Sequence, residues 1–379
     1  MLIEPKQTMP NTAKQLLEKI RALPLPKQVR IMNVCGGHER SITMAGLRSA
    51  LPSTIELIPG PGCPVCICPE EDIYLAIQLA LHEPLILLAF GDMLRVPVNV
   101  PKATIRTLEQ AKAAGADIRP IASPTEAVTI AKANPELTVV FFVAGFETTC
   151  APVAAMLGQG IPDNLLLLMS GRLTWPAVAL LLHSDTPTFD ALIAPGHVAT
   201  IMGAEQWRFV VEQHQIPTAV AGFTTESLLA AIYSVLRQLL DNNLLLDNCY
   251  PQVVNSEGNR KAQQLLQTNF TVIDVPWRGI GVIPHSGFEL NAELAAHNVR
   301  LHFPDYVSAA RKNAGTMPAG CDCASVVLGK IKPNACRLYG AACTPRQPVG
   351  PCMVSDEGAC RIWWSSGIKQ TTAITLEPY

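Results

Sequence analysis

One pattern recurs along most of this chain and restricts its possible folds more than any other feature. From about residue 28 to 240, short apolar runs of strand length end in glycine or a polar residue and are followed by segments of helix length. Strands that are apolar throughout and alternate with helices are typical of parallel sheets buried on both faces. The expected strands are Arg30–Val34, Ile55–Ile58, Leu85–Phe90, Asp117–Ile121, Thr138–Ala144, Leu165–Met169, Ala191–Ala194 and Thr218–Ala221.

This pattern predicts an α/β fold in three units. Eight strands suit two sheets of about four strands better than one wide sheet, which gives parallel-sheet α/β domains at residues 28–122 and 123–244. Beyond them the alternation stops, and from Ala319 onward cysteine, glycine and proline dominate. Residues 245–379, together with the N-terminal segment 1–27, are predicted to form a third, mostly helical and irregular domain that is rich in cysteine.

The composition excludes several classes of protein. Hydrophobic residues form 49% of the chain, charged residues 16%, and the net charge is −2. This balance disfavours long disorder, a coiled coil and electrostatic binding of nucleic acid. The longest apolar runs fall short of the ~20 residues of a spanning helix, and Met1–Lys14 lacks the apolar region of a signal peptide. We expect a cytoplasmic protein with neither nucleic acid nor membrane as a partner.

Cysteine is the most informative residue type in this sequence. The chain has 12 cysteines, and half of them lie in one C-terminal segment. These six are Cys321, Cys323, Cys336, Cys343, Cys352 and Cys360. In a reducing compartment such density indicates metal ligation or redox chemistry more than structural disulfides. Four thiolates can hold a [4Fe–4S] cluster and leave two as a dithiol or disulfide. The C-x₂₋₄-C pairing usual at zinc sites is absent. A cluster is therefore favoured, with zinc or inert buried thiols as the alternatives.

More thiols follow the first two expected strands. Cys35 is followed by two glycines and His38, and Cys63 and Cys66 form a CxxC motif just ahead of a predicted helix. Ligands of open α/β sheets bind beyond the carboxyl ends of the strands, so we expect these groups to gather on one rim. The CxxC spacing suits a redox dithiol or half a metal site. His38 could serve as ligand, base or hydrogen-bond donor. The alternative is a packing cysteine with a capping histidine.

Other candidates carry weaker signals. Asp92, Glu147 and His197 also follow expected strands, but each is equally typical of a residue that caps the next helix. No Walker A motif or GxGxxG motif occurs, so nothing indicates a nucleotide site. The remaining cysteines and tryptophans that we considered are expected to pack in the core or in an interface; they are Cys150, Cys249, Trp277, Trp363 and Trp364.

Taken together, several motifs resemble the HypD family of hydrogenase maturation factors. They run in order from about residue 15 to 365 and comprise CGGHE at 35–39, GPGCPVC at 60–66, FGDMLRVP at 90–97, GFETT at 145–149, PGHV at 195–198, WRGIG at 277–281 and PVGPCMVSDEGAC at 348–360. The last of these is highly specific. The chain departs from the family pattern at GFTTE (222–226) and HNV (297–299), and Cys68 is an additional thiol.

The resemblance implies a role in building the Fe(CN)₂CO group of [NiFe] hydrogenases. It implies two α/β domains with a cluster-bearing third domain, and two partners, a small HypC-like chaperone and a HypE-like cyanide donor. Three sets of residues follow from the family pattern: the [4Fe–4S] ligands Cys321, Cys336, Cys343 and Cys360; a redox pair of Cys323 and Cys352; and the iron-assembly thiols Cys35, Cys63 and Cys66.

Such a protein is a scaffold with redox activity rather than a free-standing metabolic enzyme. His38 would tune the iron site by hydrogen bonding. The first alternative is an iron–sulfur thiol–disulfide reductase that acts on a partner protein. The second alternative is a binding module with a structural metal and no turnover. Cys35 discriminates between scaffold and reductase, because a reductase needs the CxxC motif but has no use for a third thiol beside it.

Overall fold

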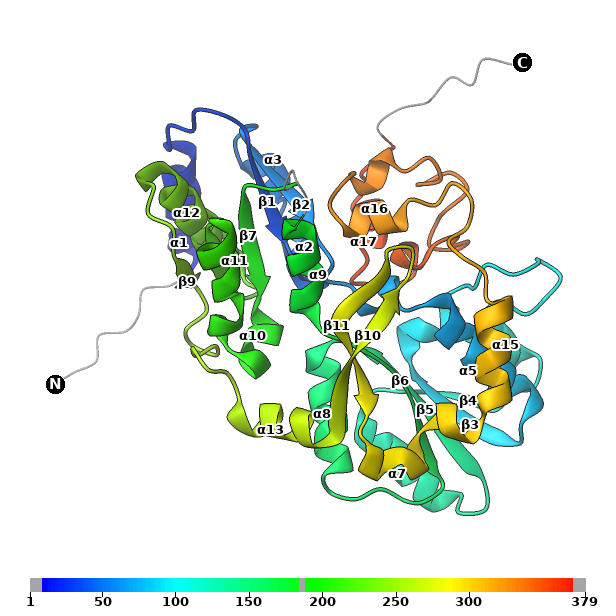
Figure 1. Cartoon of the computed structure of the whole chain (residues 1–379). Helices are drawn as coiled ribbons and strands as arrows, with labels where there is room; N and C mark the ends of the chain where they lie inside the picture. The colour runs from blue at the N-terminus through cyan, green and yellow to red at the C-terminus, as the bar shows by residue number, and fades with distance from the viewer. Residues whose placement is uncertain (1–8, 184–187, 371–379) are drawn as a thin grey trace, which may run out of the picture.

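Two β-sheets form the framework of the computed structural model, which describes residues 9–183 and 188–370 (Figure 1). The five-stranded sheet has the order β2-β1-β7-β8-β9, and every pairing in it is parallel. The six-stranded sheet has the order β10-β11-β6-β5-β3-β4 and is antiparallel only where β10 and β11 join. The strands are β1 (Val29–Asn33), β2 (Ile55–Pro59), β3 (Leu85–Phe90), β4 (Ile118–Ile121), β5 (Thr138–Gly145), β6 (Leu165–Arg172), β7 (Ala191–Pro195), β8 (Thr218–Ala221), β9 (Leu246–Asn248), β10 (Phe270–Trp277) and β11 (Gly281–Leu290).

Helices connect and cover the strands. The α-helices are α1 (Met9–Arg21), α2 (Gly36–Met44), α3 (Leu47–Ala50), α4 (Pro64–Ile67), α5 (Glu70–His82), α6 (Leu108–Ala113), α7 (Pro124–Ala133), α8 (Glu147–Leu157), α9 (Thr174–Leu182), α10 (Gly196–Met202), α11 (Arg208–His214), α12 (Thr225–Asp241), α13 (Arg260–Asn269), α14 (Val299–His302), α15 (Pro304–Asn313), α16 (Cys323–Val327) and α17 (Ala359–Ser365). The 3₁₀ helices are η1 (Gly91–Arg95), η2 (Ala204–Trp207), η3 (Ala292–His297), η4 (Pro333–Ala335) and η5 (Pro351–Met353).

The predicted α/β class and the eight predicted strands are confirmed. The apolar runs became strands because each supplies side chains to both faces of a buried sheet. In β3, for example, Leu87 packs into the core on one face, while Ile86 and Leu88 pack into the core on the other face. Strand β5 is covered in the same way, with Phe141 and Phe142 on opposite sides.

The boundary predicted at residue 122 does not separate the two sheets. Strands β1 and β2 pair with β7–β9, whereas β3 and β4 pair with β5 and β6. The chain leaves the five-stranded sheet after β2 and returns to it with β7, so each sheet combines segments that are distant in the sequence. Hydrophobic runs reveal where strands occur but not which strands become neighbours, and this is why the sequence predicted contiguous domains.

The residues assigned to the third domain also contribute to both sheets. Strand β9 forms one edge of the five-stranded sheet, and the β10–β11 hairpin extends the six-stranded sheet. Helix α1, which was grouped with the C-terminal unit, packs instead with the core of the five-stranded sheet, and its fully buried Ile20 belongs to the same core as Ile31. Residues 1–8 and 371–379 of the predicted domain lie outside the described residues.

The cysteine-rich segment from residue 319 to 370 is irregular, as predicted, with only short helices. Its Cys323, Cys352 and Trp363 belong to the same hydrophobic core as Leu87 of the six-stranded sheet. The segment exists as a distinct stretch of chain, but its shared core does not separate it as an independent domain. Figure 1 shows α16 and α17 beside the tip of the β10–β11 hairpin.

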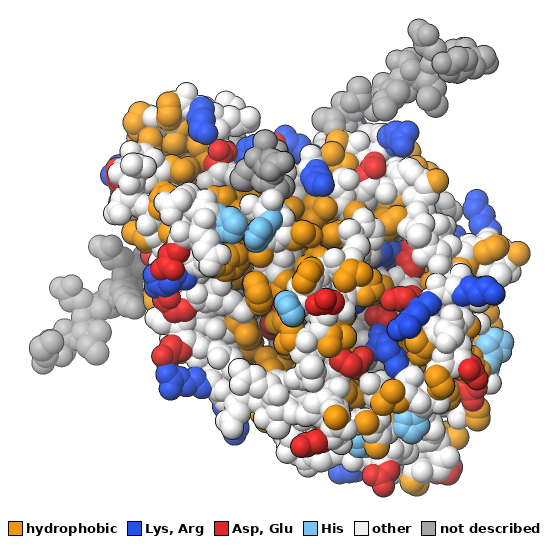
Figure 2. All heavy atoms as spheres, viewed as in Figure 1, with side chains coloured by type: hydrophobic (Ala, Val, Ile, Leu, Met, Phe, Trp, Pro, Cys, Tyr) orange, Lys and Arg blue, Asp and Glu red, His pale blue; other side chains and the backbone are white. Residues whose placement is uncertain are grey.

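The surface of the described residues agrees with the low charge content. Hydrophobic side chains gather across the middle of the face shown in Figure 2, and most charged side chains lie toward its periphery. None of the described helices is long and apolar enough to span a membrane.

Candidate functional site

Loops that carry reactive side chains lie in a row at the carboxyl edge of the five-stranded sheet. Because β1 lies between β2 and β7, Asn33 at its end pairs with both Pro59 and Ile193. The CxxC loop follows β2, Cys35 follows β1, His197 follows β7 and Phe223 follows β8. This is the edge at which α/β sheets bind ligands.

Cys35 is held against the CxxC loop by two glycines. Its backbone is extended at the start of α2, and the Gly36 N–H donates to the Gly62 carbonyl at 3.1 Å. An alanine Cβ at position 62 would lie 2.5 Å from both N and Cα of Cys35, so only glycine permits this approach. Burial raises the pKa of the Cys35 thiol to about 12; the Glu357 carboxylate adds to the shift, and the His38 and Gly37 N–H groups oppose it.

Cys63 and Cys66 are joined by a disulfide bond. Cys63 precedes the single turn of α4, and its sulfur accepts the backbone N–H of Cys66 at 3.2 Å. Cys35 and Cys63 line a cavity of about 10 Å³ together with Cys352 from the C-terminal segment. This volume holds about one water molecule. The cavity therefore brings together a cysteine sulfur from each of three loops, two of them at the sheet edge and one from the tail.

The tail thiols lie close to one another. Cys352 is within hydrogen-bonding reach of Cys323 and Cys360, and the sulfurs of Cys321 and Cys323 are 3.4 Å apart. Hydrogen bonds from Cys323 and Cys360 lower the pKa of Cys352, whereas hydrogen bonds with Cys323 and Cys352 raise the pKa of Cys360. Burial raises the pKa of Cys343 to about 11 and also raises that of Cys336.

The tail thiols are near neighbours but not a preformed metal cage. Across residues 9–183 and 188–370, no three His, Cys, Asp or Glu side chains are arranged to hold a metal ion. The donor set is nevertheless of the kind that iron–sulfur clusters use, because all four ligands of the family pattern are thiols, with Cys336, Cys343 and Cys360 buried and Cys321 half-buried. Gly350 also lies directly against the sulfurs of Cys321 and Cys323, where a side chain would occupy the space beside them.

Several polar contacts fasten the tail to the sheet edges. The Trp363 indole N–H donates to Glu39 of α2 at 2.5 Å. Ser355 Oγ donates to Asp92 at 2.9 Å, and Arg95 donates to the Pro345 carbonyl at 2.6 Å. Asp92 and Arg95 belong to the FGDMLRVP motif, so one function of this motif is to hold the cysteine-rich segment in place.

His38 contacts the end of strand β8. Its Nε2 lies 3.0 Å from the Ala221 carbonyl and therefore donates a proton, which leaves Nδ1 as an unprotonated nitrogen without a hydrogen-bond partner among the described residues. Burial lowers the pKa of His38 to about 4. The ring packs on Phe223, and His197 stacks on the same ring at 3.8 Å between centroids. The structure joins the two histidines through Phe223, and it is the backbone N–H of His38 that points to the Cys35 thiol.

The rim predicted from the sequence is divided between two sheets. Asp92 and Glu147 lie at the carboxyl edge of the six-stranded sheet, apart from the row that contains Cys35. Phe146, not Glu147, is the N-cap residue of α8, and the two carboxylate oxygens of Glu147 accept the N–H and Oγ of Thr174, each at 2.7 Å. Burial raises the pKa of Glu147 to about 7.

The remaining cysteines and tryptophans have mixed environments. Cys150 is fully buried in the core behind Gly171, and Trp277 is also a core residue, as predicted. Cys249 is half-buried, with its thiol 3.6 Å from the Asp247 carboxylate. Trp363 is buried at the contact with α2, whereas 41% of the Trp364 surface is exposed.

Sequence reasoning missed Glu357, which lines the thiol cavity. Its position within the SDEGAC stretch between two cysteines was the available signal. Sequence reasoning also missed Arg278, a buried guanidinium that forms a 2.6 Å ion pair with Glu70 beside the CxxC loop. Its signal in the sequence was the WRGIG motif at 277–281.

Comparison with known proteins identifies the family. The family model described as "HypD: Hydrogenase formation hypA family" matches residues 11–367. This chain belongs to the HypD family. The resemblance inferred from the motifs is therefore confirmed, and the match covers both sheets and all six tail cysteines.

Named relatives are similar over nearly their whole length. The hydrogenase expression/formation protein HupD of Azotobacter chroococcum mcd 1 is 36% identical over 376 residues, which cover 96% of this chain and 97% of the relative. The hydrogenase maturation factor HypD of Rhizobium leguminosarum bv. viciae is 37% identical, with coverage of 94% and 93%. The HypD of Escherichia coli strain K12 is 36% identical, with coverage of 94% and 95%.

Proposed function

We propose that this HypD family member is a scaffold on which the Fe(CN)₂CO group of [NiFe] hydrogenases is assembled. Its iron substrate would be held by Cys35, Cys63 and Cys66. The observation that carries the proposal is the single cavity lined by Cys35, Cys63 and Cys352. Family membership and relatives named as hydrogenase maturation factors supply the biological process.

Thiolates suit this substrate because soft sulfur ligands stabilise low-valent iron that carries strong-field ligands. The cavity has room for about one water molecule, so the loops must move apart before iron with its diatomic ligands can enter. Such an opening would also admit a thiolate from a small HypC-like chaperone and a HypE-like cyanide donor. We propose these two proteins as the partners.

The Cys63–Cys66 disulfide must be reduced before both sulfurs can bind iron. We propose that Cys352 performs this step as a thiolate, and its place with Cys63 in the lining of the same cavity supports that role. Its sulfur attacks Cys63 to form a Cys352–Cys63 bond, and Cys66 leaves as a thiolate that takes up a proton. Cys323 then attacks Cys352, which forms the Cys323–Cys352 disulfide and releases Cys63. The two protons lost by the tail thiols match the two gained by the CxxC thiols.

A [4Fe–4S] cluster on Cys321, Cys336, Cys343 and Cys360 completes the proposal. When bound, such a cluster supplies electrons that return the tail pair to the dithiol form. The assignment is supported by the family pattern and by the buried sulfur donors of the tail. His38 would orient the Cys35 loop through its bond to Ala221, so its replacement should weaken maturation less than replacement of Cys35.

The direct test is complementation of a strain that lacks its own family member. With Cys35→Ser or Cys35→Ala, hydrogenase activity should fall to the level of the empty vector, while Cys249→Ser serves as a thiol control and should retain activity. Normal hydrogenase activity with either Cys35 variant would contradict the scaffold proposal. Retained thiol–disulfide exchange with a partner protein in those variants would favour the reductase alternative.

A further inference from the structure

The CxxC segment lies where the chain crosses from one sheet to the other. Strand β2 of the five-stranded sheet leads into it, and α5 and β3 of the six-stranded sheet follow it. On the upstream side, the Gly60 N–H donates to the Asn33 carbonyl at 2.9 Å, and the Gly62 carbonyl accepts the Gly36 N–H. These bonds fix the beginning of the segment to the loop of Cys35.

Arg278 fixes the downstream side from the β10–β11 turn. Its backbone N–H donates to the Ile67 carbonyl at 2.9 Å, directly after Cys66. Its guanidinium donates to Glu70 in the first turn of α5 at 2.6 Å and to the Pro97 carbonyl at 2.7 Å. The side chains of Arg278 and Glu70 are only 1% and 4% exposed, so this is a buried ion pair.

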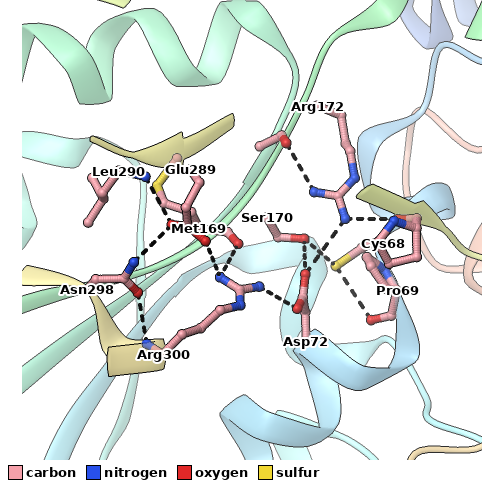
Figure 3. Close-up of polar contacts among 12 residues, drawn as sticks. Cys68, Pro69, Asp72, Met169, Ser170, Arg172, Glu289, Leu290, Asn298 and Arg300 are labelled. Carbon is pink, nitrogen blue, oxygen red and sulfur yellow. Dashed lines mark hydrogen bonds and ion pairs between the residues drawn. The ribbon is translucent and has the colours of Figure 1, made fainter. Parts of the chain in front are cut away.

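Two more arginines hold the same helical turn through Asp72 (Figure 3). Arg300 of α14 donates to Asp72 at 2.6 Å, and Arg172 of β6 lies 3.8 Å from it. Ser170 Oγ donates to the second oxygen of Asp72 at 2.7 Å and contacts the Cys68 thiol at 3.4 Å. The additional cysteine of the CPVCIC stretch is therefore part of this polar network.

Stability alone does not explain a buried network of ion pairs such as this one. Removing charges from water is costly, and buried ion pairs can often be replaced by apolar residues without loss of stability. Buried ion pairs instead fix the relative positions of the elements that carry them, because each guanidinium requires its carboxylate at a defined distance and orientation. Here three arginines from separate elements converge on the one turn that follows the CxxC motif. Thiol–disulfide exchange depends on such accuracy, because misplacement by about 1 Å can slow a reaction 10²-fold.

We propose that Arg172, Arg278 and Arg300, the arginine clamp, position the Cys63–Cys66 pair for exchange with Cys352. The inference rests on the proposed thiol exchange. The clamp holds α5 and the end of the CxxC segment on the six-stranded sheet, whose core is shared with the tail that carries Cys352. It thereby sets the distance from Cys63 to Cys352 while the glycine contacts set the distance from Cys63 to Cys35.

The test traps the exchange intermediate in the full-length, anaerobically purified protein. In a Cys66→Ser background, diamide oxidises two thiols to a disulfide, and peptide mapping measures the ratio of Cys63–Cys352 to Cys323–Cys352 bridges. Adding Arg300→Gln should lower this ratio about tenfold. A change that merely destabilised the fold would affect both bridges. Arg237→Gln, which removes an exposed 2.7 Å ion pair with Asp241 on α12, is the control and should leave the ratio unchanged.

A second variant keeps the proposal testable if the first variant fails to fold. If Arg300→Gln does not fold, Glu70→Gln with Arg278→Gln removes both charges of the other buried pair and should lower the ratio by a similar factor. An unchanged ratio in a folded clamp variant would overturn the clamp alone. Absence of the Cys63–Cys352 bridge with the clamp intact would instead contradict the proposed thiol exchange, and the clamp with it.

Discussion

At the scale of single residues, burial keeps two groups of the site, Cys35 and His38, in their neutral forms. The Cys35 thiol has a pKa raised to about 12, and the His38 imidazole has a pKa lowered to about 4. Both shifts are dominated by desolvation, which disfavours the charged form of either group. Under the proposed function, iron would have to displace the proton of the Cys35 thiol, since ligation requires the thiolate.

His38 should make stability depend on pH in the acid range. Its folded-state pKa lies below the ordinary 6.5, so its contribution is present above pH 6.5 and is lost as pH falls toward 4. The shift corresponds to roughly 3 kcal/mol. In His38→Gln, whose amide can still donate to Ala221, unfolding free energy measured by urea denaturation should change less between pH 6.5 and 4.

The difference between the pH profiles of the unmodified protein and His38→Gln isolates the contribution of His38 to the free energy of unfolding. Glu147 acts in the opposite direction, because its pKa of about 7 makes its contribution greatest at acid pH and smaller above pH 7. That contribution is common to both proteins and cancels. Identical pH profiles for the two proteins would show that His38 is not held neutral by the fold.

At the scale of elements, the sequence predicted well where the strands lie along the chain, but it predicted poorly which strands pair with one another. Apolar runs such as 85–90 define strands by their own composition, and the boundaries of β3 and β8 agree with the prediction. The pairing of β1 with β7 depends on contacts between residues about 160 apart, which no local pattern encodes. For the same reason, the motifs identified Cys35 and the CxxC loop, but not the buried partner Arg278 or the cavity residue Glu357.

Gly62 sets the position of the Cys35 backbone most directly, because it lies between the CxxC loop and the start of α2. A Cβ there would meet backbone atoms of Cys35 that have no freedom to move aside. Gly62→Ala should lower the unfolding free energy by about 1–3 kcal/mol and slow diamide-driven Cys63–Cys352 bridging in the Cys66→Ser background. Gly91→Ala is the matched control, since no atom lies within 4 Å of its added Cβ. Equal effects of the two substitutions would contradict the close approach.

The cysteine-rich segment yields a prediction about ligands. Single Cys→Ala changes at Cys321, Cys336, Cys343 and Cys360 should remove iron and the brown colour of anaerobically purified protein, because each removes one of four thiolates. Cys323→Ala and Cys352→Ala should keep both, and they are the matched controls. Loss of the cluster in Cys323→Ala with retention in Cys321→Ala would show that the ligand set is wrong, and a colourless zinc-containing protein would favour the binding-module alternative.

At the scale of the whole molecule, the two sheets meet around the tail. Cys35 comes from one sheet, the CxxC segment crosses between the sheets, and Cys352 comes from a segment fastened to both by Glu39 and Asp92. Relative movement of the sheets would therefore change the spacing of all three cysteine sulfurs together. A partner that binds across both sheets could open the cavity for iron while keeping the exchange thiols in register.

The central claim is that the Cys35 cavity holds iron that carries CN and CO. Infrared spectroscopy of the anaerobically purified protein, co-expressed with its maturation partners, tests it most directly, because these ligands absorb where protein does not. We expect CN and CO bands in the unmodified protein and in Cys249→Ser, and their loss in Cys35→Ser. Bands of full intensity in Cys35→Ser would contradict the assignment of the iron site.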